Sequence, residues 1–195
     1  MANNLNSQNK IKVIALDFDG VITNLNIDWK LAIRLASKLV GYDIKSLLAF
    51  YETSHGTPAF QLVNIEIEKL ELDALKNAEP TPFIARFLKT ISKSNVEIWI
   101  VSMQSTLVVK KFLYQHNLAH FFKGVLTREQ FRSKKMQISY LLSKSGVNPD
   151  EILLIDNSES NINKCRELGI RCFHFSRWQN LDKIKKIWNS ILEVV

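Results

Sequence analysis

The chain has 195 residues, of which 46% are hydrophobic and 23% are charged, and its formal net charge is +7. This composition is typical of a globular protein and excludes a largely disordered one. No apolar run approaches the roughly 18 residues that a membrane-spanning helix needs. Residues 1–9 are polar and Asn-rich, without the apolar stretch of a secretory signal. We expect a cytoplasmic protein with no membrane segment and a flexible tail over residues 1–9.

The basic charge and the two cysteines point to no special class. Lys and Arg residues are spread along the chain, and no basic block is interleaved with aromatic residues. This distribution argues against nucleic-acid binding and fits a positive field that attracts small anions. Cys165 lies in a helical pattern and Cys172 in a strand-like run, so we expect two reduced thiols rather than a disulfide or a metal site.

Five short apolar runs predict β-strands, at residues 11–16, 96–101, 124–126, 152–155 and 170–175. Between the later runs, apolar residues recur at helical spacing, and Gly169 is expected to stop the helix before the fifth run. A closing amphipathic helix is predicted from an apolar stripe made of Leu181, Ile184, Ile187, Trp188 and Ile191. Strands that alternate with helices predict an α/β fold, with a parallel sheet covered by helices on both faces.

The first two strands are separated by about eighty residues, far more than one crossover helix requires. Residues 24–79 have helical periodicity, interrupted by turn residues. We expect a small all-helical insertion there, within a core formed by residues 10–23 and 80–195. Thr81 or Pro82 is expected to open the helix that returns to the core.

Polar side chains follow several of the predicted strands. Asp17 and Asp19 end the first, Ser102 follows the second, and Asp156 ends the fourth. In an open parallel sheet, ligands bind outside the carboxyl ends of the strands. Two carboxylates that flank the carbonyl of Phe18 form an all-oxygen set suited to Mg²⁺, which in turn favours a phosphate ligand.

The order of these motifs resembles that of the haloacid dehalogenase superfamily, over nearly the whole chain. The first motif matches residues 17–21 (Asp-Phe-Asp-Gly-Val), the second matches 100–102 (Ile-Val-Ser), and the fourth matches 154–158 (Leu-Ile-Asp-Asn-Ser). Lys134 is the better match to the lysine of the third motif, and Lys135 is the alternative. The resemblance implies a Rossmann-like core with a small helical cap of the C1 type, and an enzyme of the phosphatase branch.

By this resemblance, Asp17 is the nucleophile that forms an aspartyl-phosphate, and Asp19 is the general acid and base. The phosphoryl oxygens are bound by Ser102, by backbone amides such as that of Met103, and by Lys134. The metal ligands implied for Mg²⁺ are Asp17, a backbone carbonyl of Phe18 or Asp19, Asp156 and Asn157. A second acid such as Asp19 favours phosphoryl transfer over carbon–halogen cleavage.

Two features of the sequence leave alternatives open. Asn157 stands where the superfamily commonly has a second acid, and its side chain either coordinates the metal or satisfies backbone groups in the loop. In the insertion, His55, Arg34 and Lys30 are candidates for contacting the substrate, although a loop histidine is more often a surface residue. Trp29 is expected in the core of the cap rather than as a substrate platform.

The sequence therefore favours a Mg²⁺-dependent phosphomonoester hydrolase that acts on a small phosphorylated metabolite. One alternative is a phosphomutase, which returns the phosphoryl group to an isomeric substrate while its cap excludes water. Another is a non-catalytic binding module on the same fold, motivated by Asn157 and the net positive charge.

Overall fold

Five parallel strands form the centre of the protein in the computed structural model, which describes residues 10–175 and 181–193. The strands lie in the order β3-β2-β1-β4-β5, and their bounds are β1 Val13–Leu16, β2 Glu97–Val101, β3 Gly124–Leu126, β4 Ile152–Asp156 and β5 Arg171–His174. Each strand coincides with a predicted apolar run to within two residues at either end. The tail expected over residues 1–9 lies outside the described residues.

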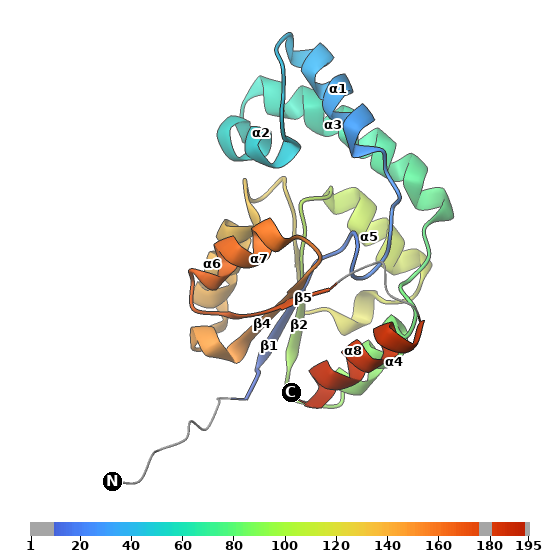
Figure 1. Ribbon diagram of the computed structural model, residues 1–195, viewed down its shortest axis with the longest axis vertical. Coiled ribbons are helices and arrows are strands. Elements are labelled where there is room, and N and C mark those ends of the chain that lie inside the picture. The colour runs from blue at the N-terminus through green and yellow to red at the C-terminus, as the bar shows by residue number, and fades with distance from the viewer. Residues whose placement is uncertain (1–9, 176–180, 194–195) are drawn as a thin grey trace.

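Helices cover both faces of the sheet, as Figure 1 shows. Ile14 and Leu16 of β1 belong to the hydrophobic cluster under α4, α5 and α8, whereas Val13 and Ala15 belong to the cluster under α6 and α7. Successive side chains of a strand point to opposite faces, so a strand that is buried on both faces is apolar throughout. The bounds of these helices are α4 Ile84–Ile91, α5 Thr106–Gln115, α6 Lys134–Ser145, α7 Glu159–Arg166 and α8 Leu181–Glu193.

The parallel α/β fold predicted from the sequence is confirmed, with small differences at the helix ends. Helix α4 begins at Ile84 and not at Thr81 or Pro82. The reason is that the Thr81 N–H donates to the carbonyl of Ile22 at 2.8 Å, and Phe83 adopts a left-handed φ of 66° before the helix starts. Three short 3₁₀ segments complete the core and its connections, η1 Leu75–Asn77, η2 Ala119–Phe121 and η3 Pro149–Glu151.

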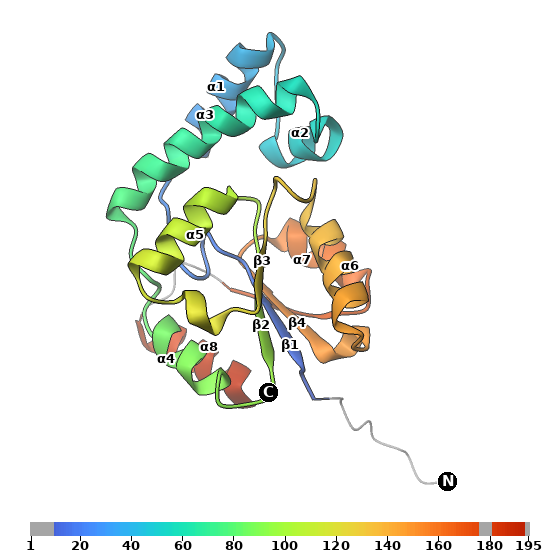
Figure 2. The ribbon, with the colours of Figure 1, turned by 180° about the vertical axis from the view of Figure 1, so that it is seen from behind.

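The insertion between β1 and β2 is helical, as predicted, and it lies beyond the carboxyl ends of the strands (Figures 1 and 2). It contains α1 Trp29–Val40, α2 Leu47–Ser54 and α3 Pro58–Ala74, which we call the cap helices. They bury a hydrophobic cluster of their own, which includes Ala32, Ala36, Phe50, Val63 and Ile67. Thr23 forms an isolated bridge with Pro80, so the two connections between the cap and the sheet run side by side.

The two cysteines and the last helix agree with the predictions from the sequence. Cys165 and Cys172 are free thiols, and burial raises the pKa of Cys165 to about 12. Helix α8 buries Ile184, Trp188 and Ile191 against the sheet, as its apolar stripe predicts. None of the helices in the described part of the chain is long and apolar enough to cross a membrane.

Candidate active site

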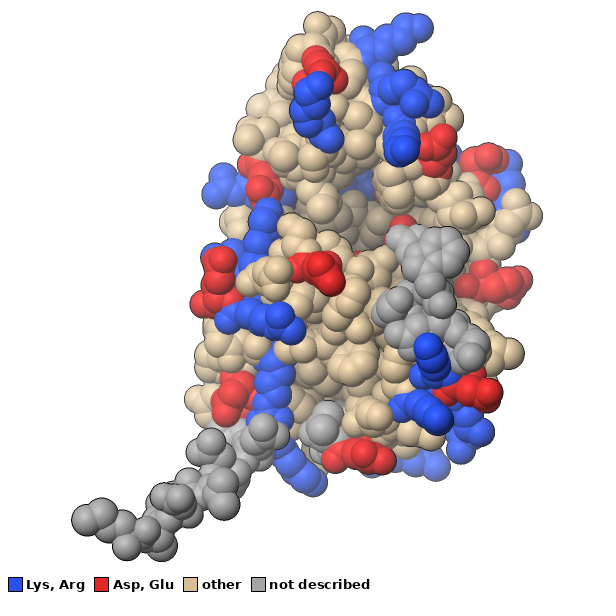
Figure 3. Space-filling model, viewed as in Figure 1, with Lys and Arg blue, Asp and Glu red and all other residues tan. Residues whose placement is uncertain are grey.

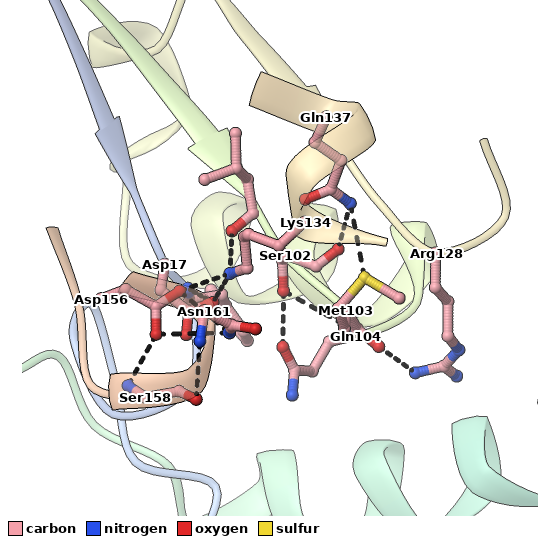
Figure 4. A network of polar contacts seen from close by, with 12 residues as sticks. Asp17, Ser102, Met103, Gln104, Arg128, Lys134, Gln137, Asp156, Ser158 and Asn161 are labelled. Carbon is pink, nitrogen blue, oxygen red and sulfur yellow. Dashed lines mark hydrogen bonds and ion pairs between the residues drawn. The ribbon is translucent and has the colours of Figure 1, made fainter. Parts of the chain in front are cut away.

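The three central strands bring the polar residues that follow them to one edge of the sheet (Figure 4). β1 pairs with both β2 and β4, so Asp17, Ser102 and Asp156 end neighbouring strands. The hydrogen-bond ladder of the sheet continues one residue past β1 and β2. The Asp17 N–H donates to the carbonyl of Ile155 and the Ser102 N–H donates to the carbonyl of Leu126, both at 2.9 Å. The strand pairing therefore fixes the backbone from which these side chains project.

Lys134 connects the two buried carboxylates of this edge. It is the first residue of α6, and its Nζ lies 2.7 Å from Asp17 Oδ1, 3.1 Å from Asp156 Oδ2 and 2.7 Å from the carbonyl of Val101. Lys135 instead forms an ion pair with Glu167 on the outside of the protein. Of the two lysines that the sequence leaves open, Lys134 is the one that the structure brings to the strand ends.

Negative charge exceeds positive charge around Lys134. Burial and the neighbouring carboxylate of Asp156 raise the pKa of Asp17 to about 7, although Lys134 and the Phe18 N–H oppose this shift. Burial lowers the pKa of Lys134, but the two carboxylates outweigh that effect and hold it above its usual value. One ammonium group facing two carboxylates leaves an excess of negative charge, which a bound cation would offset.

Asp19 lies in a tight turn that follows β1. Its Oδ1 accepts a hydrogen bond from the Leu25 N–H at 3.0 Å, and its side chain is buried. The carbonyl of Phe18 accepts hydrogen bonds from the Ile22 and Thr23 amides, at 3.0 and 3.1 Å. Because this carbonyl is already held by the turn, the geometry argues against Phe18 as the backbone ligand of a metal.

Asn157 packs directly against this turn. A Cβ on Gly20 would lie 2.1 Å from Asn157 Nδ2, and Gly20 has a φ of +91°, which L side chains rarely adopt. Gly20 therefore allows the Asn157 side chain to lie against the turn that carries Asp19. Asn157 also lines the cavity described below, so its packing role and a ligand role are compatible.

Ser102 is fully buried and forms hydrogen bonds within its own loop. Its hydroxyl donates to Gln104 Oε1 at 2.5 Å and accepts from the Gln104 N–H at 3.1 Å, while Gln137 Nε2 donates to the Ser102 carbonyl at 2.7 Å. The side chains of this loop that line the cavity are those of Met103 and Gln104. Gln104 is a polar group at the site that we did not single out from the sequence.

Asn161 is a second group that the sequence analysis missed. Its Nδ2 lies 3.2 Å from Asp156 Oδ2, and Asp156 Oδ1 also accepts the Ser158 N–H at 2.7 Å. Asn161 lies in the first turn of α7, which Ser158 caps. The sequence did contain a signal for Asn161. It is an amide in the first turn of the helix that directly follows the strand ending in Asp156.

The cap and the strand ends border an open cavity of about 420 Å³, which lies where the surface in Figure 3 is hollowed. This volume is in the range of small-molecule sites. The cavity is lined by Asp17, Asp19, Trp29, Ile33, Lys45, Ser46, Leu47, Leu48, Tyr51, Met103, Gln104, Lys134, Asn157, Ser158 and Asn161. The cap therefore covers the strand ends at which Asp17 and Lys134 meet.

Three of the cap residues named from the sequence do not line this cavity. Arg34 is exposed on α1, and His55 Nε2 lies 3.1 Å from the carbonyl oxygen of Arg128, which places His55 between the cap and the core. Lys30 is also exposed and outside the lining. Lys45, which the sequence analysis did not select, is the cap lysine among the lining residues.

The donor set at the strand ends fits Mg²⁺ better than a softer metal. Among residues 10–175 and 181–193, no group of three or more His, Cys, Asp and Glu side chains could hold a metal ion. Mg²⁺ usually takes one or two protein carboxylates and completes its shell with waters and substrate phosphate. Asp17 and Asp156, with Asn157 in the lining of the same cavity, match that pattern.

Residues 14–175 match the sequence profile of the haloacid dehalogenase-like hydrolases. The chain belongs to this family. The resemblance read from the motifs is thereby confirmed, and so is the expectation of a hydrolytic enzyme.

Curated relatives of this haloacid dehalogenase-like hydrolase are named phosphoglycolate phosphatases. The phosphoglycolate phosphatase of Aliivibrio fischeri is 25% identical over 191 residues, which cover 84% of this chain and 83% of the relative. The phosphoglycolate phosphatase of Vibrio cholerae is 24% identical over 190 residues, which cover 85% of this chain and 83% of the relative. The relatives thus extend over most of the chain, including the cap helices.

Solved structures share the fold of this hydrolase at low identity. A predicted phosphoglycolate phosphatase from Haemophilus somnus superposes with a TM-score of 0.65 at 18% identity, over 94% of this chain and 97% of the other. A predicted phosphatase from Clostridium acetobutylicum superposes with a TM-score of 0.69 at 12% identity, over 95% of this chain and 100% of the other. These likenesses confirm the Rossmann-like sheet with its added helices.

Proposed function

We propose that the protein is a Mg²⁺-dependent phosphomonoester hydrolase that acts on a small phosphorylated metabolite in the cytoplasm. The observation that carries this proposal is the buried Lys134 ammonium, which bonds to both Asp17 and Asp156 at the floor of the cavity beneath the cap. Such a site can hold a phosphoryl group beside a carboxylate and offset part of its charge. The phosphatase names of the curated relatives support the same reaction class.

Asp17 is the nucleophile in this proposal. Its Oδ1 accepts hydrogen bonds from the Phe18 N–H at 2.8 Å and from Lys134 at 2.7 Å, which orients the carboxylate. The other oxygen, Oδ2, forms the bond to phosphorus as the ester P–O bond breaks. Asp19 gives its proton to the departing alkoxide, then accepts a proton from the water that cleaves the aspartyl-phosphate, so both carboxylates return to their starting state.

The remaining residues bind the phosphoryl group and the metal. Lys134 and the Met103 amide contact the phosphoryl oxygens, and the Ser102 hydroxyl does so by exchanging its hydrogen bond to Gln104 Oε1 for one to the phosphoryl group. Asp17, the backbone carbonyl of Asp19, Asp156 and Asn157 would hold Mg²⁺, which would supply positive charge to offset that of the carboxylates and the phosphate. Phosphoryl transfer depends mainly on such positioning and charge stabilisation.

A direct test measures phosphate release from an aryl phosphate by the wild type, Asp17→Asn, Asp19→Asn and Asp73→Asn. Asp73 is an exposed carboxylate of α3 outside the cavity, so its variant controls for the loss of a charge. We expect the two variants of the site to lose at least about 10²-fold in kcat/KM, and the control to match the wild type. Turnover that persists after chelation of Mg²⁺, or in Asp17→Asn, would refute the mechanism.

Product analysis with a sugar phosphate separates hydrolysis from the phosphomutase alternative. Hydrolysis yields one free phosphate for each substrate consumed. An isomeric sugar phosphate with no free phosphate would show that the chain is a mutase instead.

A further inference from the structure

The cavity has two chemically different walls. The core supplies a polar floor, made of Asp17, Asp19, Lys134, Asn157, Ser158 and Asn161. The cap supplies a roof that is mainly apolar, made of Trp29, Ile33, Leu47, Leu48 and Tyr51, with Lys45 and Ser46 beside them. If phosphate binds at the floor, the roof contacts the alcohol part of the substrate.

The roof presents apolar surface that the cap does not use for its own core. Leu48 is 37% exposed and lies outside the hydrophobic cluster of the cap. Trp29 and Ile33 are only half-buried, so they pack on that cluster with one side and line the cavity with another. Trp29 thus serves the cap core, as expected from the sequence, and the cavity as well. Apolar side chains left open in a concave site favour an apolar ligand.

Positive charge is weak in the roof. Lys45 is 87% exposed in its side chain and forms an ion pair with Asp43, whose carboxylate offsets its charge. Arg34 and Lys30 do not line the cavity. A carboxylate placed against this roof would lose water without gaining a buried cation, which is unfavourable.

Polar side chains suited to several hydroxyl groups are also few. Ser46 caps α2, and its hydroxyl accepts the Ala49 N–H at 3.4 Å. Tyr51 is buried, with Arg128 over its ring, and its hydroxyl has no hydrogen-bond partner among the described residues, so the hydroxyls of Tyr51 and Ser46 are the polar groups that the roof offers besides Lys45. A polyhydroxylated alcohol would therefore leave hydroxyl groups unpaired under the cap.

We infer that the substrate is a phosphomonoester whose alcohol part is apolar, such as an arylalkyl or branched alkyl group, rather than an acid or a sugar. The inference rests on the proposed function, because it places phosphate at the floor. The inferred substrate differs from phosphoglycolate, for which the curated relatives are named, because the alcohol part of phosphoglycolate carries a carboxylate.

The test compares three primary alkyl monophosphates, so that the reacting bond is similar in each. Benzyl phosphate, 2-phosphoglycolate and glycerol 1-phosphate are assayed for phosphate release with Mg²⁺. We expect kcat/KM for benzyl phosphate to exceed the other two by about 10–200-fold, the range that apolar contacts supply. A preference for 2-phosphoglycolate or glycerol 1-phosphate would overturn the inference and leave the proposed function standing.

Leu48→Ala locates the preference in the roof, with Leu39→Ala as the matched control. Leu39 is 38% exposed on α1 and does not line the cavity. We expect Leu48→Ala to lower kcat/KM for benzyl phosphate by about tenfold, with little change for 2-phosphoglycolate, and Leu39→Ala to change neither. An equal loss on both substrates in Leu48→Ala would contradict the assignment.

A binding measurement keeps the inference independent of turnover. By calorimetry, the non-hydrolysable 2-phenylethylphosphonate should bind more tightly than 3-phosphonopropionate, and Leu48→Ala should reduce that difference. If none of the phosphates is hydrolysed, the proposed function fails, and this binding comparison still decides the character of the roof. Tighter binding of 3-phosphonopropionate would refute the inference.

Discussion

At the scale of single residues, Lys134 and Lys135 show how one position along a helix separates two roles. Lys134 reaches Asp17 and Asp156 in the interior, whereas Lys135 reaches Glu167 at the surface. Neighbouring residues on a helix point in directions about 100° apart, so only one of two adjacent lysines can face the strand ends. Their chemistry is identical, and their surroundings differ completely.

We predict that Lys134→Ala lowers kcat/KM by about 10²–10³-fold, because a charged donor to the developing transition state is lost. Lys135→Ala removes the same functional group from the surface and should retain the activity of the wild type. Phosphate release and thermal melting, measured on both variants, check the prediction. Equal losses of activity in the two variants would show that Lys134 has no special role.

At the scale of elements, a buried ion pair joins the cap to the loop that follows β3, and Arg128 of that pair also bonds to the loop that follows β2. Arg128 Nη1 lies 2.5 Å from Glu71 Oε1 of α3. The same nitrogen donates to the carbonyl of Met103 at 3.0 Å (Figure 4). Glu71 Oε2 accepts the Ser105 N–H at 3.1 Å, and Arg128 Nε donates to Asn64 of α3 at 2.6 Å. Helix α3 therefore contacts the loop that carries Ser102 directly at Ser105, and through Arg128 at Met103.

We predict that Glu71→Gln destabilises the protein by about 3–5 kcal/mol, because the Arg128 guanidinium stays buried without its partner charge. Asp73→Asn breaks an ion pair on the same helix, but that carboxylate is 76% exposed, so it should cost about 1 kcal/mol or less. Urea unfolding of both variants measures the difference.

The double variant Arg128→Met/Glu71→Met removes both charges and should recover part of the stability lost in Glu71→Gln. A loss in Glu71→Gln no larger than that in Asp73→Asn would mean that the buried pair does not hold the cap to the core.

At the scale of the whole molecule, the face seen in Figure 3 carries charges of both signs. Lys and Arg alternate with Asp and Glu over the face seen in Figure 3. Several of these residues form exposed ion pairs, such as Lys69 with Glu66 and Lys76 with Asp73. A mixed surface of this kind gives a weak long-range field, whereas nucleic-acid binding needs a continuous basic one.

We predict that the protein binds duplex DNA no more tightly than about 10⁻⁴ M at physiological salt, the weak end of non-specific binding. Fluorescence anisotropy over a series of salt concentrations measures this affinity. Sub-micromolar binding that weakens steeply with salt would instead favour the binding-module alternative raised by the net charge.

Local patterns along the chain predicted much of this structure. The five strands, the helical insertion and the acidic strand ends could be located because apolar periodicity and turn residues act over a few residues. The error at the start of α4 has a long-range cause. Helix α4 starts at Ile84 because the Thr81 N–H donates to the carbonyl of Ile22, a contact between the two cap connections that no short pattern encodes.

The sequence by itself determined the parallel α/β core, the inserted helices and the motif residues at the strand ends. Only the tertiary structure decided between Lys134 and Lys135, added Gln104 and Asn161 to the site, and placed Leu48 rather than Arg34 over the cavity. The reason is physical. Which residues a strand or helix contains depends on nearby sequence, but which side chains meet across a cavity depends on how separate elements pack.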